Sequence, residues 1–174
     1  MISYRKPQPD EAEGFAALHA QCWREAYKDI VPAELIAQMT SDRRLPMWQT
    51  VLGKDERFVM GAYADGAPVG FIISGPTDLK NIPEQDGHLW ALYIAASQHR
   101  RGIGRSLAFA ATQHWYAQGG STMTIGVLAE NKPARAFYEQ LGAEFLRFGT
   151  YKWGEFELSD CLYIWRDLTK IAKV

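Results

Sequence analysis

The sequence contains few cysteines, and their positions exclude some ways of holding a small domain together. Only Cys22 and Cys161 occur in 174 residues, and they form neither a CxxC pair nor a Cys/His ligand spacing. We therefore expect no disulfide framework, no structural zinc site and no metal cofactor. Two free thiols are the pattern of a reducing compartment, so we expect a cytoplasmic protein.

Long apolar runs and an excess of one charge are also missing. No stretch approaches the roughly 20 apolar residues that cross a bilayer, and the opening "MISYRKPQPDEAEG" has no apolar signal core. We expect neither export nor a membrane partner. The 19 Lys and Arg against 20 Asp and Glu give a net charge of -1. Because a nucleic-acid-binding protein usually carries a positive excess, no nucleic acid partner is expected, and any anion must be recognised locally.

What is present suits one globular domain spanning residues 1–174. Hydrophobic residues make up 47% of the chain and charged residues 22%, which is enough apolar surface for a real core. No repeat, linker or low-complexity segment interrupts it. We therefore expect a single folding unit.

The first half of the chain predicts a strand, three helices, a hairpin and a buried strand. Residues 2–7 alternate like a strand, and apolar positions at helical spacing follow in 10–27. Shorter helices are predicted near 33–39 and 43–52. Asp65-Gly66 between two apolar runs predicts a hairpin over 57–75. The polar segment 77–87 is predicted as a loop, and the apolar run 88–95 as a central strand.

The second half alternates helices and strands. A helix is predicted from Gly104 to the double glycine at 119–120, a β-branched strand over 122–128, and a helix over 131–142 with Pro133 in its first turn. Two closing strands follow at 143–153 and 157–168. This order predicts an α+β or mixed α/β fold around one sheet.

The segment His99 to Leu107, "HRRGIGRSL", joins the central strand to a helix through a glycine-rich turn. Such a turn lets backbone N–H groups approach a phosphate, and the helix N-terminus adds a partial positive charge. The two common nucleotide motifs are absent, since position 107 is leucine rather than the third glycine of GxGxxG and no GxxxxGK[ST] occurs. A simple tight turn with solvated arginines is the alternative.

Two segments together resemble the GNAT superfamily of N-acetyltransferases. "LWALYIAASQHRRGIGRSLA" is similar to its acetyl-CoA motif, Q/R-x-x-G-x-G/A after a central strand, and "NKPARAFYEQLGAEF" is similar to its second motif. "CWREAYKDIVP" resembles the segment that precedes the first strands in many small members. The chain departs from the pattern at His99, where Gln or Arg is usual, and we expect His99 to act through its backbone N–H.

The resemblance implies a mixed, mostly antiparallel sheet, flanked by helices, in which two neighbouring parallel strands splay apart. Acetyl-CoA, the implied cosubstrate, would lie in that wedge. Its pantetheine arm would pair with Leu92, Tyr93 and Ile94 as an added strand, and its pyrophosphate would lie on the N–H groups of residues 100–106. The implied coenzyme residues of the turn and the second motif are His99, Arg100, Arg101, Gly102, Ile103, Gly104, Arg105, Ser106, Asn131, Ala134 and Phe137.

The resemblance also implies acetyl transfer by direct attack of an amine in a ternary complex. The Leu92 N–H would stabilise the oxyanion, and Tyr138 would protonate the departing sulfur. The base is predicted as His88, with Glu84, Asp86 and water left open. The acceptor cleft would be lined by the loop 77–87 and three aromatic residues, Trp23, Tyr27 and Trp90.

Alternatives to this enzyme remain at the level of sequence. One is a catalytically silent coenzyme-A-binding sensor or interaction module on the same fold. Another is a nucleic-acid-binding domain that uses the arginine turn, which the negative net charge disfavours. For the enzyme, the acceptor is a small-molecule amine or a protein or peptide amine. The sequence also leaves open whether the chain forms a homodimer.

Overall fold

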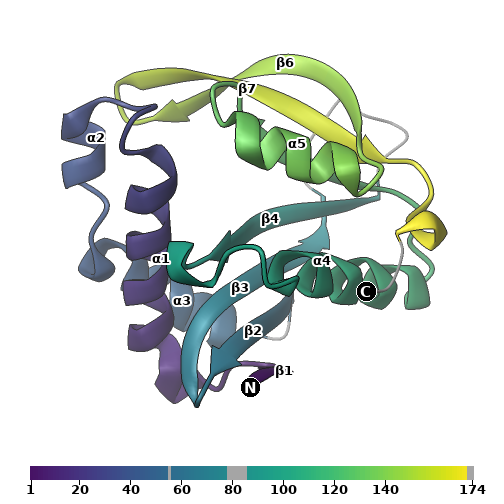
Figure 1. Ribbon diagram of the computed structural model, residues 1–174, viewed down its shortest axis with the longest axis horizontal. Coiled ribbons are helices and arrows are strands. Elements are labelled where there is room, and N and C mark those ends of the chain that lie inside the picture. Colours follow the sequence, from purple (N-terminus) through teal and green to yellow (C-terminus); the bar gives the residue numbers. More distant parts are fainter. Residues whose placement is uncertain (55, 78–85, 172–174) are drawn as a thin grey trace.

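The computed structural model describes residues 1–54, 56–77 and 86–171, and Figure 1 shows how the elements are arranged. The helices of the described chain are α1 (Ala12–Tyr27), α2 (Ala33–Ala37), α3 (Ser41–Gly53), α4 (Ile103–Ala117) and α5 (Lys132–Gln140). Its strands are β1 (Ile2–Arg5), β2 (Phe58–Ala64), β3 (Ala67–Pro76), β4 (Gly87–Ile94), β5 (Met123–Leu128), β6 (Glu144–Trp153) and β7 (Phe156–Trp165). Short 3-10 turns occur at Pro9–Glu11, Ala96–Gln98 and Leu168–Lys170.

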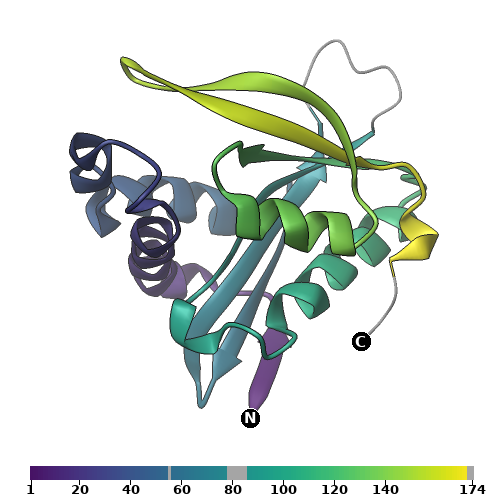
Figure 2. The same ribbon diagram turned by 45° about the horizontal axis from the view of Figure 1, so that its top comes forward.

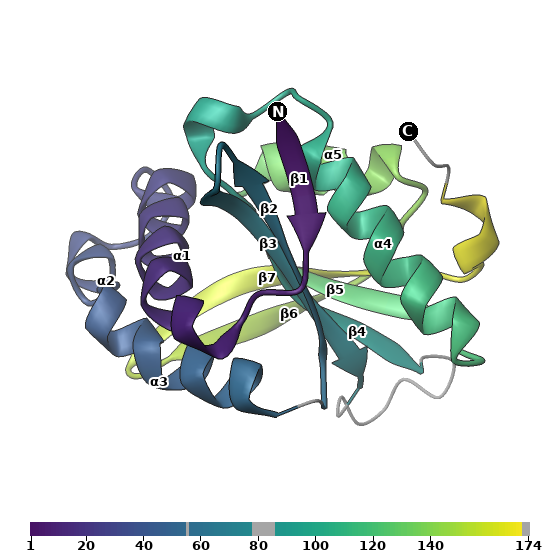
Figure 3. The same ribbon diagram turned by 90° about the horizontal axis from the view of Figure 1, so that it is seen from below.

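The strands form one seven-stranded sheet in the order β1-β2-β3-β4-β5-β7-β6. Among the strands that the structure describes, only β4 and β5 run parallel, and the other neighbouring strands are antiparallel. Seen from below, α1, α2 and α3 lie to one side and α4 and α5 to the other (Figure 3). The predicted fold class, a mixed and mostly antiparallel sheet flanked by helices, is confirmed.

Local sequence signals account for several of these elements. Asp65 and Gly66 have φ values of 49° and 86°, which is the left-handed backbone that a tight two-residue hairpin needs. The Asn131 side chain accepts a hydrogen bond from the Ala134 N–H at 3.2 Å and so caps α5, whose first turn contains Pro133. Residues such as Phe15, spaced helically along α1, are buried against the sheet.

The sheet separates two apolar cores because neighbouring residues of a strand point to opposite faces. On β3, Phe71 and Ile73 pack against α1 and α3, whereas Ile72 packs on the side of α4. The α4 side also includes Tyr138 of α5. A third cluster joins α1 and α2 to the end of the β6–β7 hairpin.

The parallel pair separates after a short paired stretch. Three register pairs join the strands, from Gly87↔Met123 to Leu89↔Ile125, and no pairing continues beyond them in the described strands. Trp90, the next residue of β4, is an extra residue against β3, where Ile73 pairs with Ala91. A bulge bends and twists its strand, so it helps to turn β4 away from β5 at this point. Figures 1 and 2 show β4 diverging from the β5–β7–β6 half of the sheet.

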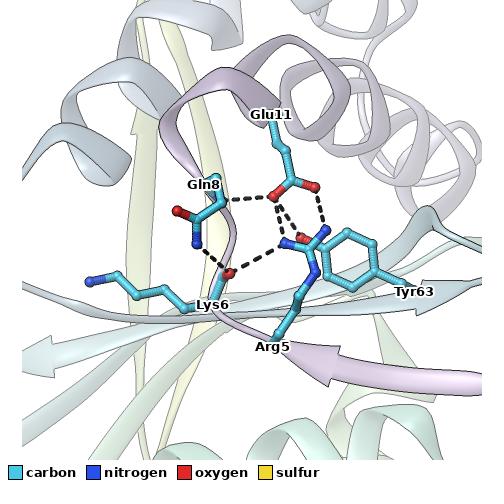
Figure 4. A network of polar contacts seen from close by, with 5 residues as sticks. All are labelled: Arg5, Lys6, Gln8, Glu11 and Tyr63. Carbon is cyan, nitrogen blue, oxygen red and sulfur yellow. Dashed lines mark hydrogen bonds and ion pairs between the residues drawn. The ribbon is translucent and has the colours of Figure 1, made fainter.

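A polar network ties β1 to the start of α1 (Figure 4). The Arg5 guanidinium donates to both carboxylate oxygens of Glu11, at 2.7 and 2.8 Å. The same carboxylate accepts from the Gln8 N–H at 2.7 Å and from the Tyr63 hydroxyl at 3.3 Å. The hydrogen bond from Arg5 lowers the pKa of Glu11 to about 2. This network fixes the angle at which α1 approaches the sheet.

Candidate active site

A cleft of about 850 Å³ passes through the split between β4 and β5. Its walls come from β4 (90–94), from the turn before α4 and from β5 (125–127). Residues of α5 line it on one side of the sheet, and Cys22 and residues 25–27 of α1 line it on the other. Because both sides contribute, two molecules can approach the split strands from opposite directions.

The turn at the start of α4 presents free backbone donors to this cleft. Arg100 and Gly102 both have left-handed φ values, 60° and 77°. The N–H groups of residues 100–105 donate to no acceptor in the described protein, and no side chain caps the helix. Successive N–H groups in such a turn, together with the helix N-terminus, form a concave site for an anion.

The structure corrects two details of the predicted turn. The Ser106 N–H donates to the Gly102 carbonyl at 3.0 Å, so the free donors end one residue earlier than expected. The His99 N–H donates to the Ala96 carbonyl at 3.2 Å, so the expectation that His99 acts through this group is wrong. Its ring Nε2 instead lies 2.9 Å from the Ile94 carbonyl oxygen. The imidazole therefore joins the end of β4 to the turn and uses one of the two acceptor positions of that carbonyl.

The arginines of the turn differ in their surroundings. Arg100 and Arg105 line the cleft together with Ile103 and Gly104. Arg101 is absent from the lining, and its guanidinium donates to the Gln98 side chain. Arg100 and Arg105 are therefore available to an anion in the cleft, whereas Arg101 is held on the outside of the turn.

The second motif forms the opposite wall. Asn131, Ala134, Phe137 and Tyr138 of α5 and its N-cap all line the cleft. Tyr138 is 5% exposed, its ring packs edge-on against Trp165, and its hydroxyl makes no hydrogen bond in the described structure. Burial raises the pKa of Tyr138, so its hydroxyl stays protonated at neutral pH. A protonated, unpartnered hydroxyl in a cleft is available as a donor.

The aromatic residues expected at the acceptor cleft divide into two groups. Tyr27 and Trp90 line the cleft, and the Tyr27 hydroxyl lies 3.2 Å from the hydroxyl of Tyr93, which also lines it. Burial raises the pKa of both tyrosines. Trp23 is not part of the lining; it is buried between Tyr27 and Trp153, with ring centroids 4.8 and 5.7 Å away.

His88 lies in the paired part of β4, before the strands separate. It is 8% exposed, its Nδ1 lies 2.7 Å from the Thr124 hydroxyl, and its ring packs edge-on against Trp90. It does not line the cleft. The structure therefore does not bring His88 together with Tyr138 at the cleft surface, and its role as base stays a prediction.

Asp86 has a structural position. Its carboxylate accepts hydrogen bonds from Trp115 Nε1 at 2.8 Å, from the Ser121 N–H at 2.7 Å and from the Thr122 N–H at 3.0 Å. Burial alone would raise the pKa of Asp86, but these hydrogen bonds hold that pKa below its ordinary value. The Asp86 carboxylate therefore links α4 to the segment before β5. A carboxylate that accepts these hydrogen bonds is a poor proton acceptor. Glu84, the other carboxylate considered, lies outside the described residues.

Some cleft residues were missed from the sequence. Cys22, Glu25 and Ala26 of α1 line it, as do residues 125–127 of β5. Their sequence signal is limited to proximity to Tyr27 and to the predicted strand. Glu25 accepts hydrogen bonds from the Ala96 N–H and the Gln21 side chain, both at 2.8 Å. It therefore anchors the end of β4 to α1.

Three further features of the described residues concern metal ions, thiols and membranes. No three His, Cys, Asp or Glu side chains gather there as a metal ion would require. Cys22 and Cys161 are both buried free thiols. Within the same residues, every helix is too short or too polar to cross a bilayer.

Comparison with known proteins gives the family. The model of the Acetyltransferase (GNAT) family matches residues 13–143. The chain therefore belongs to the GNAT acetyltransferase family. It is 23% identical over 176 residues to the uncharacterized N-acetyltransferase YuaI of Bacillus subtilis (strain 168), covering 98% of this chain and 96% of that protein.

Solved structures confirm the fold at low sequence identity. PaiA N-acetyltransferase from Thermoplasma acidophilum, solved in complex with coenzyme A, has a TM-score of 0.67 at 19% identity and covers 92% of this chain and 97% of that chain. Arabidopsis thaliana NAA60, solved with a bisubstrate analogue, has a TM-score of 0.71 at 16% identity, with 95% and 97% covered. The similarity to both extends over nearly the whole length of each chain.

Proposed function

We propose that this chain is an acetyl-CoA-dependent N-acetyltransferase that acts on a primary amine by direct attack in a ternary complex. The observation that carries the proposal is the cleft through the split parallel pair, with an anion-binding turn at its edge. Family membership supports acetyl transfer, and the PaiA structure contains coenzyme A. The cleft is lined from both sides of the sheet, which suits two substrates bound at once.

The coenzyme would enter from the side of α4 and α5. Its pyrophosphate would accept hydrogen bonds from the N–H groups of residues 100–105, with Arg100 and Arg105 supplying charge. The pantetheine arm would extend along the unpaired edge of β4 at Leu92 and Tyr93. The Ile94 carbonyl already accepts one hydrogen bond, from His99, which leaves one acceptor position at this end of the strand.

The reaction needs an oxyanion donor and an acid. As the amine nitrogen bonds to the thioester carbon, the carbonyl oxygen becomes negative, and the Leu92 N–H would stabilise it. The C–S bond then breaks, and the sulfur leaves with the electron pair and takes a proton from Tyr138. The raised pKa of Tyr138 means that its hydroxyl is protonated at neutral pH, so the donor is present when the C–S bond breaks.

The attacking amine must also lose a proton. Of the acceptors considered from the sequence, Asp86 is engaged in hydrogen bonds, and His88, Glu84 and water stay open. Between His88 and water we favour water, because His88 is buried against Trp90 and Thr124 away from the cleft lining.

Replacing His88 by asparagine tests whether His88 is the base. Asparagine can still hydrogen-bond Thr124, so we expect a stability loss of no more than about 1 kcal/mol. The acidic limb of kcat/KM against pH should keep its midpoint if an acceptor other than His88 takes the proton. A shift or loss of that limb would return the role of base to His88.

The proposed function is tested by a panel of primary amines with acetyl-CoA, in which free thiol release is followed and the acetylated product is identified by mass spectrometry. We expect thiol release that requires both acetyl-CoA and an amine. Coenzyme A binding without thiol release for any amine would favour a silent coenzyme-A-binding module. Absence of coenzyme A binding would contradict both the proposed enzyme and the silent module.

A further inference from the structure

Asp160 of β7 presents its carboxylate on the face of the sheet that α1 and α2 cover. It pairs with Leu128 of β5, and directly opposed residues of an antiparallel pair point to the same face. Leu128 packs in the cluster that contains Trp23 and Tyr27 of α1. Leu158, two residues before Asp160 on the same strand, packs there too. The Asp160 side chain therefore lies on the side of the sheet opposite to α4 and its anion-binding turn.

Two glycines leave room around this carboxylate. Gly149 of β6 lies directly opposite Asp160, and a Cβ at Gly149 would lie 2.5 Å from Oδ1, too close to fit. On the other side, Gly126 of β5 lines the cleft, and a Cβ there would lie 3.8 Å from Oδ2. In the described chain no other atom comes within 4 Å of that position, the neighbours of Gly126 along the chain apart. The space over Gly126 therefore connects the carboxylate to the cleft.

This space opens where the parallel strands separate. Ile125, the residue before Gly126, is the last residue of β5 that pairs with β4, and its partner is Leu89. In the proposed function the thioester lies just beyond this point, between Leu92 and Tyr138. Because the coenzyme would enter from the side of α4 and α5, the amine would approach from the side that Asp160 faces.

Asp160 has no partner for its charge among the residues that the structure describes. It takes part in no ion pair and accepts no hydrogen bond from another residue. Its side chain is half-buried, and neither oxygen is a buried atom without a partner, so both oxygens face open space. Glu25, the carboxylate in the described cleft lining, instead accepts a hydrogen bond on each oxygen. Asp160 thus has the free lone pairs that a proton acceptor needs.

The groups around Asp160 leave it one cationic neighbour. Burial raises its pKa, and the exposed Arg147 of β6 lowers it by less, so the carboxylate is more basic than an ordinary aspartate. The Cys161 thiol beside it on β7 is uncharged, because burial raises its pKa. The hydroxyls of Tyr27 on α1 and Tyr151 on β6 are kept protonated in the same way.

From this juxtaposition we propose that Asp160 accepts the proton of the acceptor ammonium through one water held over Gly126. The inference rests on the proposed function and deepens it, because it names the group to which water passes the proton. An N–H bond of the ammonium breaks, its electron pair stays on nitrogen as the nucleophile, and a proton arrives on Asp160, which later releases it to solvent. As the amide forms, the nitrogen loses its second proton, and this proton replaces the one that Tyr138 gives to the sulfur.

The pH dependence of kcat/KM tests this role with the best acceptor of the amine panel. The wild type deprotonates a bound ammonium, so its kcat/KM should stay level from pH 7 up to the pKa of the amine. Asp160→Asn keeps the shape of the side chain but should lower kcat/KM at pH 7 by about 100-fold. Since this variant uses only the neutral amine, its kcat/KM should rise about tenfold per pH unit up to that pKa, about 10.4 for a lysine-like amine and about 8 for a peptide N-terminus. The KM for acetyl-CoA should not change.

Gly126→Ala tests the path while it keeps the carboxylate. The added methyl group would lie at ordinary contact distance from Asp160 Oδ2, so the fold can accommodate it, but it would take the place of the water. The pH profile should become that of Asp160→Asn. Adding Gly126→Ala to Asp160→Asn should then change kcat/KM by less than about threefold, because both changes interrupt one path.

Glu157→Gln is the control. Glu157 lies on the same strand, its side chain is 62% exposed, and it forms an ion pair with Lys152 at 2.8 Å. This variant should keep the level profile and the rate of the wild type. A level profile in Asp160→Asn, or losses that multiply in the double variant, would overturn the inference while amine acetylation itself stands.

Binding decides the inference if no amine is acetylated. Butylamine and its uncharged analogue 1-butanol are titrated by calorimetry at pH 7 into the protein saturated with coenzyme A. Asp160→Asn should weaken the binding of butylamine by about tenfold and leave that of 1-butanol unchanged, because only the ammonium interacts with the carboxylate. That result would support the role of Asp160 although the proposed function fails. Equal butylamine binding by both proteins, or none, would overturn the inference.

Discussion

Replacing Gly104 by valine is expected to weaken coenzyme A binding by about 10- to 100-fold. A Cβ at this position would lie 3.2 Å from both Ile94 Cδ1 and the Phe137 ring, tighter than ordinary contact. Those two side chains line the cleft on either side of the turn, so the added methyl groups would occupy space beside the free N–H groups. The crowding displaces the turn, and the loss of one charge-assisted hydrogen bond from its N–H groups to the pyrophosphate, worth about 1.5–3 kcal/mol, corresponds to the fold-change given. Calorimetry with coenzyme A measures it.

The matched control is Gly53→Val at the end of α3. A Cβ there would meet nothing within 4 Å, and Gly53 lies outside the cleft lining. Coenzyme A affinity should therefore stay within about twofold of the wild type, since no contact to the cleft changes. Unchanged affinity in Gly104→Val would place the pyrophosphate elsewhere and remove the main support for the proposed function.

The features that could be predicted from the sequence are those with a local signal. Asp65-Gly66 predicts its hairpin because the left-handed backbone of the turn is a property of those two residues. The pattern around Gly102 and Gly104 predicts a strand, a turn and a helix because all three occur within about twenty residues. The splayed parallel pair came instead from the family resemblance, since periodicity alone does not show where two strands separate.

The features that escaped prediction depend on residues distant in the chain. Asp86 was considered as a base, but its partners Trp115 and Thr122 lie 29 and 36 residues away, and only the folded chain shows that they bind its carboxylate. Glu25 also lacks a local signal, because the Ala96 N–H whose hydrogen bond its carboxylate accepts belongs to a residue 71 positions away. Polar side chains take their roles from such partners, and a single sequence does not contain them.

The Tyr138→Phe variant should lower kcat by about 100-fold while coenzyme A affinity stays within about twofold. Phenylalanine keeps the ring that packs against Trp165, so only the proton donor is lost. General acid catalysis contributes about 10²- to 10⁴-fold. The lower end applies here because a thiol with a pKa near 8.5 leaves more readily than an alkoxide. Thiol release at saturating acetyl-CoA, with coenzyme A calorimetry beside it, measures the two effects separately.

Protein stability distinguishes a catalytic role for Tyr138 from a structural one. Its hydroxyl has no hydrogen-bond partner in the described structure, so Tyr138→Phe should not lower the free energy of unfolding. Tyr63→Phe is the opposite case, because the Tyr63 hydroxyl donates to Glu11 at 3.3 Å, far from the cleft. That variant should lose about 1 kcal/mol of stability and keep its kcat.

The pH profile adds a third readout. Because burial raises the pKa of Tyr138 above its ordinary value near 10, the hydroxyl remains protonated up to and beyond that pH. The wild-type rate should therefore not fall between pH 7 and 9 through loss of this proton, and Tyr138→Phe should be slower by the same factor across that range. A deficit that disappears at pH 9, or a kcat equal to that of the wild type, would show that the sulfur leaves without help from Tyr138.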